Sequence, residues 1–250
     1  MGDAARLSVT EHGPPDGPLV VLVHGAMDRA RSMRRVVERL PDLRVVLYDR
    51  RGYGGSVEAG PPTGLAQHVS DLLDVLGTRR ATVVAHSFGC HIAVLASMAH
   101  PELVAGVGLW EPPVPWMDFW PERSKRIVAR IVAAGDPGAV AEAGAKSMLG
   151  DEGWARLSDE ARAQRRAEGP AFVTDMASEL EPLYDWGAVK VPCVIGYGGN
   201  TWPYSADASQ RVAAMVGCEA FVVDGAPHMG HATHPDGFAA FVRRAVALGS

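Results

Sequence analysis

Cysteine is scarce in this sequence, and its distribution argues against a disulfide framework. The 250 residues include three cysteines, Cys90, Cys193 and Cys218, with no C-x-x-C spacing. An odd number of cysteines in or beside apolar runs indicates buried small hydrophobic side chains in a reducing compartment. We therefore expect a cytoplasmic protein.

A strongly basic region and a long apolar run are also missing. The formal net charge is −5, and the densest basic group, Arg29, Arg31, Arg34 and Arg35, has helical spacing. That spacing predicts a solvated helix face, so neither nucleic acid nor an anionic membrane is expected as a partner. Residues 1–10 are polar, which argues against a signal peptide or a membrane-spanning segment in this stretch.

The composition is that of one sizeable α/β domain with an insertion, since 47% of the residues are hydrophobic, 21% are charged and no repeat occurs. Apolar runs rich in β-branched residues alternate with segments of helical periodicity. Strands are predicted at 6–12, 19–23, 44–48, 81–85, 103–109, 192–197 and 220–223, and helices at 30–40, at 65–76, at 92–96 and from Pro235 onward. This alternation predicts a mostly parallel sheet with helices on both faces.

A single serine separates the strand at 81–85 from the helix that follows it. Ser87 has Ala85 two residues before it and Gly89 two residues after it. Small flanking residues at a strand-to-helix turn predict a nucleophile elbow, in which a strained backbone lifts the hydroxyl above the sheet. The alternative is a serine that only caps the helix.

The strand at 19–23 ends in His24-Gly25, just before a loop. In enzymes with a nucleophile elbow, such a loop supplies a backbone N–H group that binds an oxyanion. We assign this role to Ala26, together with the N–H of Phe88. His24 is expected to support the loop and to transfer no proton.

Three segments together carry a family resemblance. His24-Gly25, residues 49–56 (DRRGYGGS) and residues 85–89 (AHSFG), in this order and with these gaps, resemble the α/β-hydrolase superfamily over almost the whole chain. The resemblance implies the α/β-hydrolase fold and a nucleophile, an acid and a histidine in chain order. Asp49 precedes a glycine-rich turn, so we expect it to bind the loop rather than to act as that acid.

His228 lies where the resemblance places the general base, in the loop after the last strand and seven residues before Pro235. A loop position gives the imidazole room to take a proton from Ser87 and return it to the leaving group. His231 and His234 share the loop, so three metal-ligating histidines are an alternative. No acidic ligand accompanies them, and no metal is expected.

The acid is missing from its common place after the next-to-last strand. The loop at 198–203 carries no carboxylate, and Asn200 or Thr201 occupies the expected position. A neighbouring parallel strand, at 103–109, ends at the same edge of the sheet. We therefore assign the acid to Glu111, with Asp224 and then Asp207 as alternatives.

This placement sharpens the resemblance. Glu111-Pro112, Thr201 and residues 228–236 are similar to the zearalenone-type lactone hydrolases, which have a Ser-His-Glu triad. The resemblance implies a cofactor-free serine hydrolase that cleaves an ester or a lactone through an acyl-enzyme. The alternatives are a carbon-carbon bond hydrolase with the same triad and an inactive ligand-binding protein. Epoxide hydrolases and haloalkane dehalogenases are disfavoured because they need a carboxylate where Ser87 stands.

Residues 112–190 are too many for a simple crossover and predict a helical lid, between the two parts of a core domain at 1–111 and 191–250. Its helices are predicted at 118–134, 138–149, 159–168 and 172–180. The side chains expected to contact an apolar or ring-bearing small-molecule substrate are Met27, Trp116, Trp120, Trp154 and Phe172. The alternative for each tryptophan is attachment of the lid to the core, and a homodimer is left open.

Overall fold

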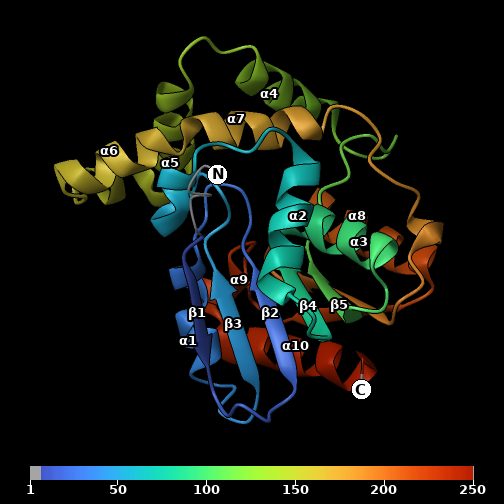
Figure 1. Cartoon of the computed structure of the whole chain (residues 1–250). Helices are drawn as coiled ribbons and strands as arrows, with labels where there is room; N and C mark the ends of the chain where they lie inside the picture. Colours follow the sequence, from blue (N-terminus) through green and yellow to red (C-terminus); the bar gives the residue numbers. More distant parts are fainter. Residues whose placement is uncertain (1–6, 250) are drawn as a thin grey trace.

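A computed structural model describes residues 7–249, which form a seven-stranded sheet in the order β1-β3-β2-β4-β5-β6-β7 (Figure 1). Only β1 runs antiparallel, against β3. The strands are β1 (Val9–His12), β2 (Leu19–Val23), β3 (Arg44–Tyr48), β4 (Ala81–His86), β5 (Val104–Trp110), β6 (Cys193–Gly198) and β7 (Glu219–Val223). The predicted mostly parallel sheet is confirmed. The predicted start of the first strand falls partly on residues 1–6, outside the described range.

Both faces of the sheet are apolar because successive strand residues point to opposite sides. In β2, for example, Val21 and Val23 belong to one core cluster, and Val20 and Leu22 belong to the other. The helices that bury the first cluster are α2 (Leu65–Leu76), α3 (Gly89–Ala99) and α8 (Pro203–Val216). The helices that bury the second are α1 (Arg34–Val37) and α10 (Pro235–Gly249).

The prediction of one continuous α-helix at 30–40 is wrong. The chain instead makes a 3₁₀ turn, η1 (Ala30–Met33), followed by the single turn of α1. The backbone N–H of Arg39 donates to Val36 O and that of Leu40 to Val37 O, so the tighter i to i+3 pattern also closes the segment. Two further 3₁₀ turns, η2 (Gly54–Ala59) and η3 (Trp186–Ala188), lie in connections.

Four helices lie between β5 and β6 in the chain and above the sheet in Figure 1. They are α4 (Glu122–Val132), α5 (Pro137–Ala155), α6 (Asp159–Ala167) and α7 (Gly169–Ser178). The four helices predicted here are present with shifted ends. The second runs past residue 149 because its two halves join at a kink at Gly150, where φ is 70°.

Buried ion pairs attach α7 to the main body. Arg50 donates to the Asp175 carboxylate at 2.8 Å, and Tyr53 Oη and His68 Nε2 lie 2.6 and 2.9 Å from the same group. Burial raises the pKa of Asp175, but Arg50 and His68 outweigh burial and lower it to about 2. Glu168, which lies between α6 and α7, pairs likewise with a buried arginine of the main body.

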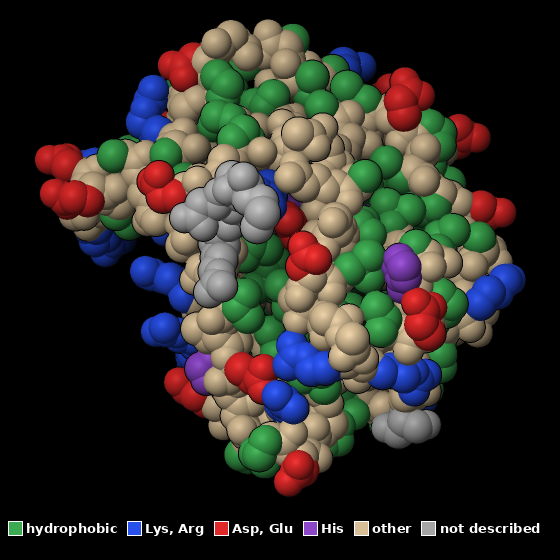
Figure 2. Space-filling model, viewed as in Figure 1, with side chains coloured by type: hydrophobic (Ala, Val, Ile, Leu, Met, Phe, Trp, Pro, Cys, Tyr) green, Lys and Arg blue, Asp and Glu red, His purple; other side chains and the backbone are tan. Residues whose placement is uncertain are grey.

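The surface carries interspersed charges of both signs, and the visible face has no continuous basic patch (Figure 2). Among residues 7–249, no helix combines the length and apolar character needed to span a membrane.

Candidate active site

Ser87 occupies a strained turn between β4 and α3. Its φ is 52°, in the left-handed region that residues with a side chain rarely adopt. Its N–H donates to Trp110 O of the neighbouring strand at 2.8 Å. A Cβ on Gly89 would lie 2.8 Å from two carbonyl oxygens of the β2 segment, so this position requires glycine. The residue at the N-cap position of α3 is Phe88, and the Ser87 hydroxyl makes no hydrogen bond with any described residue, so it is available.

Glu111 follows β5 and also has a positive φ, 49°. Its Oε2 accepts hydrogen bonds from His228 Nδ1 at 2.6 Å, Thr201 Oγ1 at 2.8 Å and Ser205 Oγ at 2.7 Å. Its Oε1 accepts from the Gly198 N–H at 3.0 Å. Burial raises the pKa of Glu111, but the His228 contact and the other donors lower it below its usual value. The side chain is therefore an ionised carboxylate that faces a histidine ring.

The alternative acids do not approach His228. Asp224 is exposed, and Asp207 pairs with Arg211 at 2.8 Å on the surface of α8. In the loop at 198–203, where the common pattern places the acid, Thr201 supplies a hydrogen-bond donor to Glu111 instead of a carboxylate. Asp49 accepts from the N–H groups of Ala30 and Gly55, each at 2.8 Å, as expected for a loop-binding residue.

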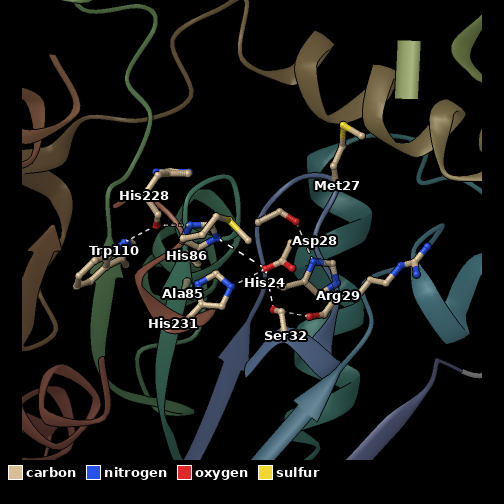
Figure 3. A network of polar contacts seen from close by, with 12 residues as sticks. His24, Met27, Asp28, Arg29, Ser32, Ala85, His86, Trp110, His228 and His231 are labelled. Atoms are coloured by element: carbon tan, nitrogen blue, oxygen red, sulfur yellow. Dashed lines mark hydrogen bonds and ion pairs between the residues drawn. The ribbon is translucent and has the colours of Figure 1, made fainter. Parts of the chain in front are cut away.

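Side chains of the sheet fix the His228 loop through the backbone carbonyl of His228. Trp110 Nε1 donates to His228 O at 2.9 Å, and His86 Nε2 lies 3.2 Å from the same oxygen (Figure 3). A Cβ on Gly230 would lie 2.7 Å from the Trp110 ring, so the loop packs closely on that side chain. The His228 side chain remains 20% exposed, which leaves it accessible from the cavity.

Ser87, Glu111 and His228 line one cavity of about 220 Å³. Ala26 and Phe88, the expected oxyanion donors, line the same cavity. No hydrogen bond of the described residues uses either backbone N–H group. The arrangement therefore combines a hydroxyl, a histidine with a carboxylate behind it, and two free N–H donors.

His24 is buried and supports the neighbouring loop. Its Nδ1 donates to Gly25 O at 2.8 Å, and its Nε2 accepts from the Arg50 N–H at 2.9 Å. Burial, and then the charge of Arg50, lowers its pKa to about 4. The ring is therefore neutral and fully hydrogen-bonded, which agrees with a supporting role.

The expected substrate contacts divide into two groups. Trp120 and Phe172 line the cavity of Ser87, and Met27 and Phe172 line an adjoining apolar cavity of about 500 Å³ between the β2 loop, α4 and α5. Trp116 and Trp154 line neither. Trp116 packs on His91 of α3 and on Tyr184, and Trp154 packs on Lys146 of α5. Sequence reasoning missed Trp202, whose ring lies 5.0 Å from that of His228.

The three-histidine metal site considered from the sequence is wrong. His228 faces Glu111, whereas His231 is fully buried and faces Asp28, and His234 contacts Thr233. The rings diverge because the short helix α9 (Gly230–Thr233) turns the chain between them.

Comparisons with known proteins agree with the fold. A sequence profile of the alpha/beta hydrolase family matches residues 20–241. Lipase LipV of Mycobacterium tuberculosis is 32% identical over 197 residues, or 76% of this chain and 69% of the lipase. Epoxide hydrolase A of the same organism is 36% identical over 118 residues, or 44% of this chain and 37% of that relative.

Solved structures resemble the whole chain. A hydrolase from Oleispira antarctica, olei00960, superimposes with a TM-score of 0.74 at 17% identity, covering 98% of this chain and 96% of that chain. A thermophilic esterase from Thermogutta terrifontis superimposes with a TM-score of 0.72 at 20% identity, covering 95% of this chain and 92% of that chain. At these identities the likeness shows the fold. Together with the profile match and the lipase, it establishes that the chain belongs to the alpha/beta hydrolase family.

Proposed function

We propose that this protein is a serine hydrolase that cleaves carboxylic esters or lactones through an acyl-enzyme intermediate. The observation that carries the proposal is the 2.6 Å contact between Glu111 Oε2 and His228 Nδ1, on the cavity that Ser87 also lines. Glu111 is the acid, His228 the general base and Ser87 the nucleophile.

The chemistry follows from the tautomer of His228. Glu111 accepts a hydrogen bond from Nδ1–H, so Nε2 carries the lone pair and takes the proton of Ser87. The Ser87 oxygen attacks the carbonyl carbon, and the N–H groups of Ala26 and Phe88 bind the oxygen that becomes negative. His228 then protonates the leaving alcohol. It next removes a proton from water, which attacks the acyl carbon; the bond between Ser87 and the acyl group then breaks, the acid leaves, and His228 returns the proton to Ser87.

The substrate is apolar or ring-bearing. The two cavities share Ala26 and Phe172, so a substrate whose carbonyl lies at Ser87 can extend its apolar part between α4 and α5. Ile127, Ile131 and Val140 line that extension. Burial of such a part stabilises binding by about 0.8 kcal/mol per CH₂ group. Helices α4–α7 serve as the lid that keeps water from this space.

The similarity to an epoxide hydrolase does not favour epoxide opening. That match covers 37% of the relative, and the reaction needs a carboxylate nucleophile where this chain has Ser87. The lipase, with 69% of its length matched, supports ester cleavage better.

Hydrolysis of chromogenic esters with acyl chains of increasing length, beside a panel of lactones, tests the proposal. Ser87→Ala should lower kcat by about 10⁵-fold or more. The matched control is Ser178→Ala, which removes a hydroxyl that only bonds a carbonyl within α7. A fluorophosphonate should label the wild type and the control but not Ser87→Ala. Turnover that survives in Ser87→Ala, or ligand binding without turnover in the wild type, would contradict the proposal.

A further inference from the structure

A second polar cluster lies buried behind the candidate active site. It consists of Asp28 from the loop after β2, His86 at the end of β4 and His231 in α9, whose exposed fractions are 6%, 2% and 0%. Figure 3 shows His86 between His228 and His231, with Asp28 close to His231. The ring centroids of His228 and His231 each lie 4.6 Å from that of His86. The proposed hydrolysis uses none of these three side chains.

The three side chains direct ligand atoms at one point. Asp28 Oδ2 lies 3.1 Å from His231 Nε2 and 4.0 Å from His86 Nδ1, and all three atoms lie within 4.8 Å of one another. His86 Nδ1 is buried and makes no hydrogen bond with any described residue, and His231 Nδ1 is also buried without a partner, whereas His231 Nε2 has the Asp28 carboxylate beside it. Buried polar atoms almost always have partners, so the orphaned His86 nitrogen that faces this carboxylate requires an explanation.

The hydrogen bond on the other side of the His86 ring fixes its tautomer. Nε2–H donates to His228 O at 3.2 Å, so Nδ1 of the neutral ring carries a lone pair. The Nδ1 lone pair of His86 and the carboxylate of Asp28 therefore face each other 4.0 Å apart in the protein interior.

No arginine or lysine of the described residues pairs with Asp28. Arg29 and Arg165 both pair with Glu168, and the Asp28 carboxylate is approached by the Ser32 hydroxyl, which donates at 3.1 Å, and by His231 Nε2. The nearby His24 has no free nitrogen, since both are bonded to backbone groups.

We propose that Asp28, His86 and His231 form a binding site for a divalent transition-metal ion, of which Zn²⁺ is the best match. Two imidazole nitrogens and one carboxylate oxygen suit Zn²⁺, whereas Ca²⁺ and Mg²⁺ prefer oxygen ligands. Metal–ligand distances of about 2.0–2.2 Å place tetrahedral ligands roughly 3.3–3.6 Å apart. The observed 3.1 and 4.0 Å bracket that spacing.

The outer contacts of two of the three side chains match those of metal ligands. A histidine that binds a metal usually donates its other ring N–H to a carbonyl or carboxylate, as His86 does to His228 O, and Ser32 bonds the ligating carboxylate, whereas His231 Nδ1 has no such partner among the described residues. The metal would connect the β2 loop, the end of β4 and α9, three segments that are distant in the chain. It would stabilise the native fold because such a site is not formed in the unfolded chain.

The test is titration of the chelator-treated full-length protein with Zn²⁺, followed by calorimetry and by thermal unfolding. The expected result is one ion per chain and a rise in Tm. His231→Gln and Asp28→Asn should each weaken binding at least about 100-fold, since even residues outside the ligand set cost 10–100-fold. His234→Gln is the matched control, because it removes the partly exposed histidine three residues further along and should bind Zn²⁺ like the wild type.

A measurement on the wild type decides the matter if these variants fail to fold. In nitrogen-detected NMR, Zn²⁺ should shift the ring resonances of His86 and His231 and leave those of His12 and His100 unchanged. No binding, or equal binding by His231→Gln, Asp28→Asn and the wild type, would overturn the proposal. Shifts confined to His12 and His100 would also overturn it, because they would show adventitious surface binding only.

Discussion

Replacement of Glu111 by glutamine tests the assignment of the acid most directly, because it removes a charge without changing the shape. The Gly198 N–H can only donate, so it should hold the new amide oxygen at the position of Oε1. The amide NH₂ then takes the position of Oε2. The hydroxyls of Thr201 and Ser205 can rotate to accept from it, so the side chain remains accommodated.

His228 cannot adapt without loss of function. Facing an NH₂ group, its Nδ1 must accept, which moves the ring proton to Nε2, where it can no longer take a proton from Ser87. Loss of the charge-assisted bond costs about 2–3 kcal/mol, and the wrong tautomer adds to this. We expect kcat to fall about 10⁴-fold, as for the corresponding change in a Ser-His-Asp protease, or about 5 kcal/mol in activation free energy.

The assay is steady-state hydrolysis of a chromogenic ester, with circular dichroism to confirm folding. Asn200→Ala is the matched control, because Asn200 is exposed in the loop where the acid commonly lies. It should change kcat by less than about twofold. If Glu111→Gln stays within tenfold of the wild type, or if the two variants lose activity equally, the reasoning fails.

Three further outcomes are expected. Asp175→Ala should lower the free energy of unfolding by about 3–5 kcal/mol in a urea titration, because it leaves Arg50 buried without its partner; a loss below 1 kcal/mol would mean that the pair does not anchor α7. The pKa of Asp175 is lowered to about 2, so its contribution to the free energy of unfolding is fully present above about pH 4 and is lost as the pH falls toward 2. Over that interval the free energy of unfolding of the wild type should therefore fall by about 2 kcal/mol more than that of Asp175→Asn. An equal fall in the two proteins would contradict this. A Cβ at Gly144 would lie 2.5 Å from Met27 Sδ, so Gly144→Val should narrow the apolar cavity. It should raise KM for long-chain esters about tenfold and leave KM for acetate esters unchanged. An equal rise for both would disprove the apolar extension.

The sheet and the surroundings of Ser87 could be predicted because their signals are local. Runs such as residues 19–23 and 81–85 are continuously apolar, as parallel strands covered on both faces must be. The contact between Glu111 and His228 could also be predicted, since two neighbouring parallel strands end at the same edge and the loop at 198–203 has no carboxylate. The contact is present at 2.6 Å, while its catalytic role remains a prediction.

The remainder depends on contacts that no short segment encodes. Asp28, His86 and His231 come together only after β2, β4 and α9 have packed, so their spacing in the chain gives no sign of a cluster. The surroundings of Trp116 and Trp154 could not be predicted, because periodicity places an aromatic residue on a helix face but does not say whether that face meets solvent, a cavity or another helix.

Because Glu111 follows β5, the proposed catalytic groups differ in how firmly the fold holds them on warming. Residues 86 and 110 are paired in adjacent strands, so the serine and the carboxylate that follow them share one stiff support. The histidine alone is carried by a loop. Heat, denaturant or a distant substitution should therefore reduce turnover through misalignment of that single ring, well before the central strands separate.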